Sequence, residues 1–321
     1  MSTTTNLRIN SMFAEHDLPK IVTPTLGGRL SDYLQGAHQI VEEELLRAGG
    51  VLFRGFDTIG EEPFQEFARS FGSPLLNYEF ASTPRTDLGE GVYTTTEYPA
   101  HQQIPLHNEQ AYTLNWPMKI WFHCITPAET EGETPIADSR LIFNKIDPKI
   151  RERFDSKKLK YVRNYGNGLD LPWEKVFATE DKKQVERFCL ANKIHFEWKS
   201  DGELRTSQVC QGVAQHPKTH EMVWFNQAHL FHVSNLEANI RETLLSVVDE
   251  EDLPRNVYYG DGSPIEDSIL AEIRGVLDEC TIKFPWQAGD ILMLDNMLTA
   301  HSRSRFTGAR KVVVAMAEGN V

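Results

Sequence analysis

Cysteine, long apolar runs and an excess of basic residues are scarce or missing in this 321-residue chain. No Cys-x-x-Cys pair occurs, which argues against both a disulfide framework and a thiolate zinc site. The longest obvious apolar run, VVVAMA at 312–317, is far too short to span a bilayer, and the N-terminus has no apolar core of signal-peptide length. We therefore expect a cytoplasmic protein with buried free thiols at Cys124, Cys189, Cys210 and Cys280.

Basic residues are outnumbered by acidic ones, 33 to 46, and the net charge is -13. This charge argues against a nucleic acid or an anionic membrane as partner, and an anionic substrate would need a local basic site. The composition is that of an ordinary globular protein. Because no repeat, low-complexity tract or flexible linker marks a boundary, we expect one domain over residues 1–321 with a largely helical insertion around 140–280.

Apolar spacing predicts strands at both ends of the chain and helices between them. Phe64, Phe67 and Phe71 stand at helical spacing, which is typical of a core-facing stripe. Ser263–Glu266 has the form of a capping box and predicts a helix from there to about residue 278. This order favours a β-sandwich or barrel decorated by helices. The other expected helices are 37–48, ending at Gly49-Gly50, and 147–154, 180–192 and 235–247; the expected strands are 51–56, 118–125, 134–138, 281–286, 290–294 and 310–317.

The stretch IPLHNEQAYT at 104–113 holds the first candidate metal ligands. Pro105 disfavours a helix here, so we expect an extended segment in which His107 and Glu109, two residues apart, face the same side. An imidazole and a carboxylate on one face suit a borderline divalent metal, which needs a third ligand. An isolated His-x-Glu is by itself a weak signal.

His301 is the best candidate for that third ligand, because it follows a predicted strand and lies among basic residues. Two pairs are alternatives: His216 and His220, whose helical spacing is spoiled by Pro217, and His229 and His232, which could share a helix face. The remaining histidines are expected to make ordinary hydrogen bonds. They are His16, His38, His101, His123 and His195.

Four stretches together resemble the TauD/TfdA family of iron(II)- and 2-oxoglutarate-dependent oxygenases. They are PLHNE, EGETPIADSR, WFNQAHLFH and DNMLTAHSRSRFTGARKVVVAMAEG. The resemblance is greatest to the clavaminate synthase-like and SyrP-like branch, in which the carboxylate ligand is Glu instead of Asp. It runs from roughly residue 25 to the C-terminus. It implies a double-stranded β-helix, or jelly roll, that is mainly β with helical insertions.

The resemblance implies that His107, Glu109 and His301 bind iron(II) as two histidines and one carboxylate. Three coordination sites would remain for 2-oxoglutarate and dioxygen. A related halogenase subgroup lacks the carboxylate so that chloride can bind, and Glu109 therefore favours hydroxylation.

Arg310 and Thr134 match the family positions that bind the distal carboxylate of 2-oxoglutarate. The arginine lies slightly further from the histidine in taurine dioxygenase itself, so the match assumes a short deletion. Arg303 and Arg305 are alternatives, although each could equally be structural or solvated. Thr134 could equally begin a strand.

Candidate substrate contacts have weaker support in the sequence than the metal ligands have. An Arg or Asn is more often a surface residue, and a Trp-Phe pair is more often part of the core. Gln110-Ala111 stands where SyrP-like relatives are expected to have Met-Ser, which argues against a shared substrate. The candidates are Tyr112, Arg163, Asn164, Trp224, Phe225 and Asn226.

The resemblance implies hydroxylation of an unactivated carbon, expected at Cβ, of an amino acid in secondary metabolism. The amino acid could be free or tethered to a peptidyl carrier protein, although carrier proteins are usually acidic, as this chain is. Desaturation or cyclisation by the same oxidant is an alternative. A metal-binding regulatory protein without turnover is another, and the intact triad, Thr134 and Arg310 count against it. A zinc hydrolase is a third, and the arginine cluster and the match at Thr134 count against that.

Overall fold

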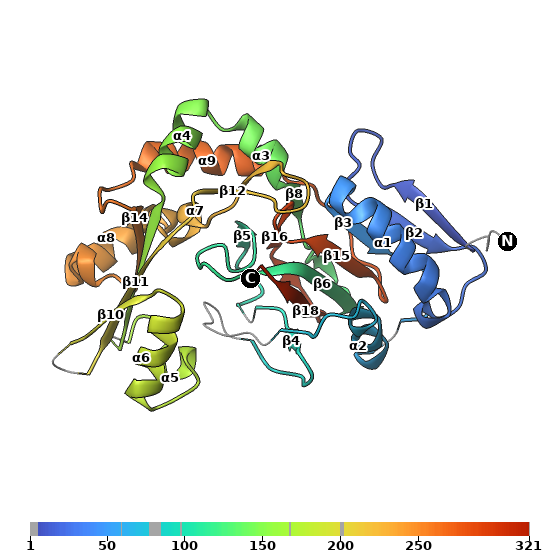
Figure 1. Ribbon diagram of the computed structural model, residues 1–321, viewed down its shortest axis with the longest axis horizontal. Helices are drawn as coiled ribbons and strands as arrows, with labels where there is room; N and C mark the ends of the chain where they lie inside the picture. The colour runs from blue at the N-terminus through green and yellow to red at the C-terminus, as the bar shows by residue number, and fades with distance from the viewer. Residues whose placement is uncertain are drawn as a thin grey trace.

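The computed structural model describes residues 6–58, 60–76, 85–96, 98–166, 168–199 and 202–320. It is a mixed α/β structure. Strands β6 (Pro117–Thr126), β15 (Ile291–Asp295) and β18 (Lys311–Gly319) of the larger sheet lie near the centre of Figure 1, and the segment around 140–280 extends to the left. Within the described residues, every helix is too short or too polar to cross a bilayer. All four cysteines are buried and free, as predicted.

Seven strands form the main sheet. All neighbouring pairs in it are antiparallel except β2 and β3, which run parallel. In spatial order the strands are β1 (Leu7–Ser11), β2 (Lys20–Pro24), β3 (Gly50–Phe53), β15 (Ile291–Asp295), β6 (Pro117–Thr126), β18 (Lys311–Gly319) and β4 (Val92–Thr94).

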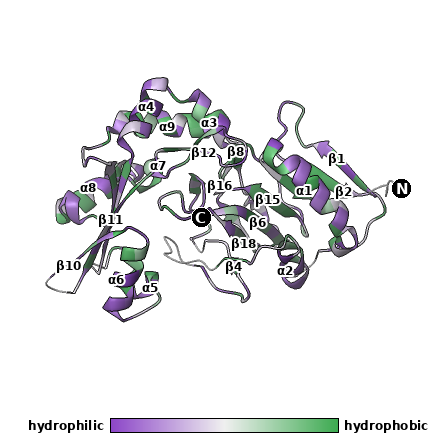
Figure 2. Ribbon diagram, in the orientation of Figure 1, coloured by the Kyte–Doolittle hydropathy of each residue, from purple (hydrophilic) through white to green (hydrophobic). Residues whose placement is uncertain are grey.

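Side chains alternate between the two faces of this sheet, as the pleat requires. Trp121 and Met293 pack on one face, under α1 (Leu34–Ala48) and α2 (Glu62–Arg69). Phe64 and Phe67 of α2 belong to the same cluster, so the predicted core stripe is confirmed. Figure 2 shows that α1 carries both hydrophobic and hydrophilic residues along its length, as an amphipathic covering helix should.

A smaller sheet faces the other side. It consists of β5 (Ile104–His107), β16 (Thr299–Arg303) and β8 (Ile136–Asp138), with β16 in the middle. Ile136 packs in one cluster with Phe122 of β6, whose ring centroid lies 4.9 Å from that of His301. The candidate ligand strands are therefore packed directly against the interior face of the main sheet.

The intervening segment combines helices with a four-stranded antiparallel sheet, whereas the sequence predicts a largely helical segment here. Its strands, in spatial order, are β10 (His195–Trp198), β11 (Leu204–Cys210), β9 (Leu159–Tyr165) and β14 (Arg255–Tyr259). A hairpin pairs β12 (Val213–Gln215) with β13 (Met222–Trp224), and another short pair joins β7 (Thr130–Glu131) to β17 (Phe306–Thr307).

The remaining helices are short, and aspartates begin several of them. Asp138, Asp147 and Asp181 each accept backbone N–H groups at a helix N-terminus. The helices are α3 (Ser139–Lys145), α4 (Pro148–Lys157), α5 (Trp173–Val176), α6 (Lys182–Ala191), α7 (Ala228–Phe231), α8 (Ala238–Val247) and α9 (Asp267–Glu279), with 3-10 turns at Leu30–Tyr33, Val233–Asn235 and Glu250–Asp252.

Most predicted elements are confirmed within a few residues, but three predictions are wrong. The extended segment at 104–113 ends at His107, where pairing with β16 stops. The capping box at Ser263 does not form: the hydroxyl and the N–H of Ser263 both donate to Asp261, and α9 begins only at Asp267. Residues 281–286 make a single bridge through Ile282 instead of a strand, consistent with Pro285, which lacks an N–H for a ladder.

Candidate metal centre

Three side chains converge between the sheets. His107 on β5 and His301 on β16 are directly paired in the antiparallel register. The His301 Nε2 lies 3.8 Å from Oε2 of Glu109. Each of the residues His107, Glu109 and His301 offers one ligand atom, and these three atoms all lie within 4.8 Å of one another. No other group of three such residues occurs among the described residues.

Glu109 reaches this place from a turn and not from a strand. Beyond His107 the chain folds back, with the Ala111 N–H donating to the Asn108 carbonyl and Gln110 at φ 56°. The prediction that His107 and Glu109 face the same site is compatible with this turn, although the predicted extended conformation is not. Glu109 is 3% exposed, so its carboxylate is nearly removed from solvent.

The charge states of these groups suit a divalent cation. Burial lowers the pKa of His107, and burial together with His107 and Arg85 lowers that of His301 well below its usual value, so both rings are neutral ligands near pH 7. The His107 Nδ1 lies 2.8 Å from the Pro105 carbonyl, which can only accept, and the lone pair is therefore on Nε2. The buried Nδ1 of His301 has no hydrogen-bond partner among the residues that the structure describes. Arg85 donates to Glu109 Oε2 at 2.7 Å.

A small cavity beside the two histidines is lined by Arg310 and Thr134. The Arg310 guanidinium donates to the Gly132 carbonyl at 2.8 Å and reaches the Thr134 hydroxyl at 3.4 Å. Among the described residues, no carboxylate lies within ion-pair range of this guanidinium. Burial, with Arg303 nearby, lowers the pKa of Arg310 to about 10, so it stays charged at neutral pH. A buried cation of this kind fits the distal carboxylate of a keto acid.

The two alternative arginines lie in different surroundings. Arg303 donates to backbone carbonyls, including those of Tyr98 and Gln102, and so fastens the loop before β5. Arg305 is largely exposed and pairs with Glu131. Arg310 therefore remains the strongest candidate for the keto acid.

A larger cavity of about 750 Å³ also borders the triad. Its lining includes His107 and Glu109 of the triad and Ile240 and Leu244 of α8. It also includes the ion pair of Asp170 and Arg255, with 2.7 Å from Nη2 to Oδ1. The cavity lining thus combines polar groups with apolar side chains of α8.

The structure does not bring the predicted substrate residues to this cavity. The Asn164 side chain donates to the Glu251 and Leu253 carbonyls, and that of Asn226 donates to the Gly212 carbonyl. Both amides are therefore engaged with backbone carbonyls. Tyr112 stacks near Phe231 in the core. The other three are also interior: Arg163 near Asp170, and Trp224 and Phe225 in apolar clusters.

Sequence reasoning missed the cavity residues that the structure does place there, chiefly Arg85, Asp170 and Arg255. None belongs to a recognisable motif, and their positions depend on how the intervening segment folds against the sheets. The alternation in LKYVRNY at 159–165 was the one available signal for the sheet that carries Arg255.

Comparison with known proteins gives a consistent result. The model for "Taurine catabolism dioxygenase TauD, TfdA family" matches residues 18–316. The dapdiamide synthesis protein DdaC of Enterobacter agglomerans is 41% identical over 280 residues, covering 87% of this chain and 85% of that protein. A clavaminate synthase-like protein of Arabidopsis thaliana is 30% identical over 283 residues, covering 85% and 82%.

Solved structures share the fold at low sequence identity. PvcB from Pseudomonas aeruginosa has a TM-score of 0.55 and 14% identity, covering 99% of this chain and 93% of that one. PvcB is described as an Fe, alpha-ketoglutarate dependent oxygenase from an isonitrile synthetic pathway. AAD-2, solved with Mn(II) and N-oxalylglycine, has a TM-score of 0.53 and 14% identity, covering 98% of each chain.

Proposed function

The chain belongs to the taurine catabolism dioxygenase TauD/TfdA family and is an iron(II)- and 2-oxoglutarate-dependent dioxygenase, and we propose that it hydroxylates an unactivated carbon of an amino acid during secondary metabolism. The observation that carries this proposal is the convergence of two neutral histidines and a buried carboxylate at the end of a ligand-sized cavity. The printed names of DdaC and PvcB, which refer to dapdiamide synthesis and an isonitrile pathway, support a biosynthetic setting.

We assign iron binding to His107, Glu109 and His301. When bound, iron(II) activates dioxygen at the expense of 2-oxoglutarate, which is converted to succinate and carbon dioxide. The chain contributes the geometry: His107 and His301 present neutral rings from paired strands, and Glu109 supplies the negative charge. Burial between two sheets keeps bulk water away from this chemistry.

Arg310 and Thr134 are proposed to bind the distal carboxylate of 2-oxoglutarate. The cation is buried, borders the same cavity as both histidines, and has hydroxyl and carbonyl groups as neighbours in place of an acid. Trp286 donates to the Thr134 oxygen at 3.2 Å, which leaves that hydroxyl hydrogen available for an anion. The cosubstrate would thereby be anchored at one end while its keto acid group faces the metal.

The large cavity is the proposed substrate site. Its volume of about 750 Å³ falls within the roughly 300–1,000 Å³ typical of sites for drug-sized ligands, and it exceeds what one small amino acid fills. Ile240 and Leu244, four residues apart on one face of α8, line it together with Leu236, which precedes the helix. This favours an amino acid that carries an extension, with the reacting carbon near the triad and the extension under α8.

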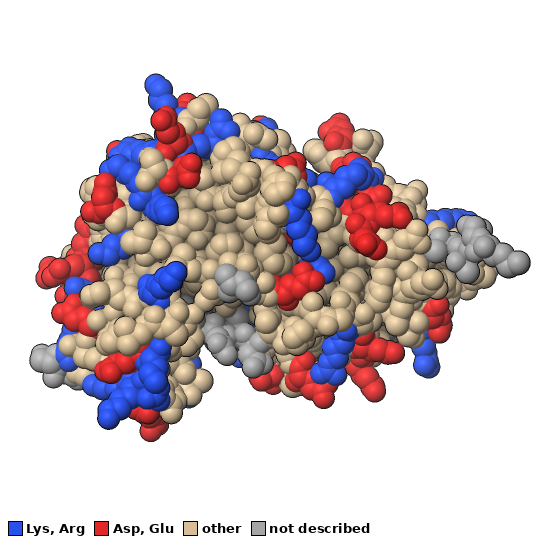
Figure 3. All heavy atoms as spheres, viewed as in Figure 1, with Lys and Arg blue, Asp and Glu red and all other residues tan. Residues whose placement is uncertain are grey.

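A carrier-bound substrate is one such extended molecule. On the face shown in Figure 3, basic and acidic side chains are interspersed, and the middle of that face is mostly uncharged. A partner docking there would rely on shape and apolar contact more than on charge. An untethered, extended amino acid is the other form, and the experiment below separates the two.

We further infer that the two facing sheets form a double-stranded β-helix and that the whole chain is one domain interrupted by the segment around 140–280. The shared apolar cluster between the sheets supports the first inference. For the second, the interrupting segment reaches the candidate site itself, because His229 and Gln227 hydrogen-bond to the backbone of residues 106 and 108.

The test is turnover with a substrate panel. Protein with iron(II) and 2-oxoglutarate is exposed to oxygen with amino acids supplied free, as N-acyl or amide derivatives, and loaded on a carrier protein, while succinate and product mass are measured. A product heavier by one oxygen atom, formed together with succinate, supports hydroxylation. Loss of two hydrogens instead would favour desaturation or cyclisation. A protein that binds metal and 2-oxoglutarate but never turns over would support the regulatory alternative.

Two variants sharpen this test. Ile240→Asp places a charge in the apolar part of the cavity and should raise KM for extended substrates by about tenfold or more, whereas Leu245→Asp changes a residue of the same helix that does not line the cavity. Equal effects of the two substitutions would remove α8 from the substrate site.

A further inference from the structure

We infer that Asn296 is a positioning residue for the metal centre, holding the backbone of Glu109 so that its carboxylate meets the two histidines. This inference rests on the proposed function of the triad. Asn296 lies in the turn between β15 and β16 and is 0% exposed.

The side-chain amide of Asn296 contacts the backbone of Glu109 on both sides. Its Oδ1 accepts from the Glu109 N–H at 2.8 Å, and its Nδ2 donates to the Glu109 carbonyl at 3.0 Å. The same Nδ2 donates to the Pro117 carbonyl at 2.8 Å. Two opposed hydrogen bonds to one residue resemble those that a neighbouring strand would make, in a place where β5 has already ended.

The backbone of Asn296 continues the attachment. Its carbonyl accepts from Asn108 Nδ2 at 2.6 Å, and its N–H donates to the Met118 carbonyl at 2.9 Å. Every polar group of Asn296 is thus engaged with the turn that carries Glu109 or with the start of β6. Because the turn has no ladder of its own, these contacts hold the backbone from which the Glu109 side chain leaves. Arg85 bonds to the Glu109 carboxylate itself, and Gln227 bonds to the Asn108 carbonyl.

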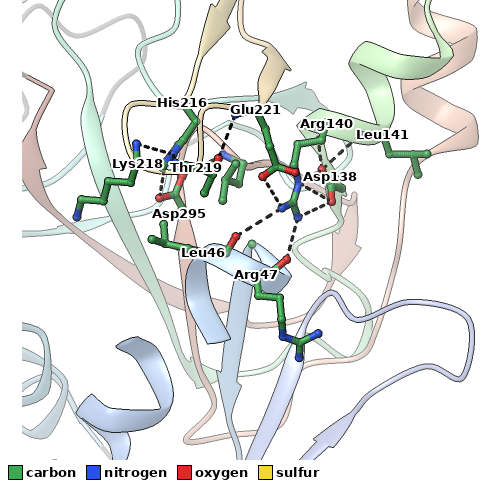
Figure 4. Close-up of polar contacts among 12 residues, drawn as sticks. Leu46, Arg47, Asp138, Arg140, Leu141, His216, Lys218, Thr219, Glu221 and Asp295 are labelled. Carbon is green, nitrogen blue, oxygen red and sulfur yellow. Dashed lines mark hydrogen bonds and ion pairs between the residues drawn. The ribbon is translucent and has the colours of Figure 1, made fainter. Parts of the chain in front are cut away.

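The turn that contains Asn296 is itself anchored. Asp295 Oδ1 accepts from the N–H groups of Met297 and Leu298, both at 3.0 Å. Its Oδ2 lies 3.2 Å from His216 Nε2. Figure 4 shows the two side chains facing each other. The His216 Nδ1 accepts from the backbone N–H of Thr219 at 3.0 Å, so Nε2 carries the hydrogen and donates to Asp295.

One short turn therefore connects the two arms of the metal centre. Asn296 fixes Glu109, and the same turn leads directly into β16, which carries His301. A displacement of the turn would move the carboxylate relative to the imidazole. Residues that orient metal ligands in this way typically change metal affinity by about 10- to 100-fold when altered.

Asparagine is the residue that this position requires. Aspartate matches its size but offers only acceptors, so it would leave the carbonyls of Glu109 and Pro117 without donors and add a buried charge. Serine keeps a small polar group but cannot bond to both sides of Glu109 at once. The two substitutions therefore perturb the same contact by different routes.

The experiment measures cobalt(II), a spectroscopic probe of the metal site, in the full-length protein. Asn296→Asp and Asn296→Ser are compared with wild type for Co(II) affinity, for the visible ligand-field spectrum and for thermal unfolding. Asn164→Asp is the matched control: Asn164 is 2% exposed and also donates to two backbone carbonyls, but away from the triad.

We expect Co(II) affinity to fall by about 10- to 100-fold in both Asn296 variants, with an altered spectrum, while Asn164→Asp lowers the unfolding temperature and leaves spectrum and affinity unchanged. Folded Asn296 variants with wild-type affinity and spectrum would overturn the inference. If Asn296→Asp does not fold, Asn296→Ser decides by the same criteria. Failure of the wild-type protein to bind Co(II) would instead refute the triad itself.

Discussion

His107 and His301 are direct neighbours across β5 and β16, with ring centroids 4.5 Å apart. Paired residues on adjacent antiparallel strands have Cβ atoms about 4.5–5.5 Å apart, so strand pairing alone brings two ligands from distant parts of the sequence within reach of one ion. A shift of one residue in this pairing would turn one imidazole to the opposite face. The register of two strands is thus the foundation of the candidate metal centre.

Replacing Glu109 by alanine should abolish hydroxylation, because two neutral imidazoles alone leave the cation without a negatively charged ligand. Succinate formation and iron(II) affinity are the measurements. Glu131→Ala, which removes a carboxylate that pairs with exposed Arg305, should leave both unchanged. Full activity in the Glu109 variant would refute its assignment as a ligand.

Arg310→Gln should raise the 2-oxoglutarate concentration needed for half-maximal turnover on the order of 10- to 100-fold, since a hydrogen-bonded charge pair contributes about 1.5–3 kcal/mol. Iron(II) affinity should not change. Thr134→Val should have a smaller effect of the same kind. The comparison variant is Arg305→Gln, and an Arg310 variant with the same 2-oxoglutarate dependence as that control would remove Arg310 from the cosubstrate site.

His229 should make the fold less stable in mild acid. Burial lowers its pKa from 6.5 to about 4, so the unfolded chain takes up a proton more readily than the native protein does. The contribution of neutral His229 to the free energy of unfolding is complete above about pH 6.5, the pKa of histidine in the unfolded chain. It declines as the pH falls from about 6.5 toward 4, and about 2 kcal/mol is lost at about pH 5.

The measurement is urea unfolding with a chelator present, for wild type and His229→Gln, at about pH 7.5 and about pH 5. Glutamine keeps a donor for the Leu106 carbonyl, which His229 Nε2 reaches at 2.7 Å. Wild type should lose about 2 kcal/mol more than the variant over this range, since other titrating groups are common to both. Parallel losses would show that His229 is not the responsible group.

Gly49→Ala should destabilise the protein by more than about 1 kcal/mol. Gly49 ends α1 at φ 84°, and an added Cβ would lie 2.5 Å from the Thr299 hydroxyl oxygen at the start of β16. Gly275→Ala is the matched substitution: it lies within α9 with open space around it and should stabilise by roughly 0.5–1 kcal/mol. Calorimetry or urea unfolding of the two variants should give shifts of opposite sign.

The sequence identifies the ligands better than it identifies the cavity. His107 and Glu109 are close in sequence, and the motif around His301 is long, so local spacing and family resemblance suffice to select them. The predicted β15 and β18 were also recognisable, because buried central strands are continuous apolar runs.

The missed features depend on contacts between segments far apart in the chain. Ser263 donates to Asp261 instead of capping α9, an interaction that the capping pattern does not reveal. Asp170 and Arg255 are 85 residues apart in the chain, and Arg255 stands on β14, which pairs with β9. The predicted pocket residues Asn164 and Asn226 instead satisfy backbone groups, because buried carbonyls need donors wherever loops cross.

The most direct test of the metal centre is the visible spectrum of the protein mixed with iron(II) and 2-oxoglutarate in the absence of oxygen. We predict a charge-transfer band from the keto acid chelated to iron. The band should be lost in each of the variants His301→Ala, His107→Ala and Glu109→Ala. Absence of the band in the wild-type protein, or its full retention when His301 is removed, would contradict the account.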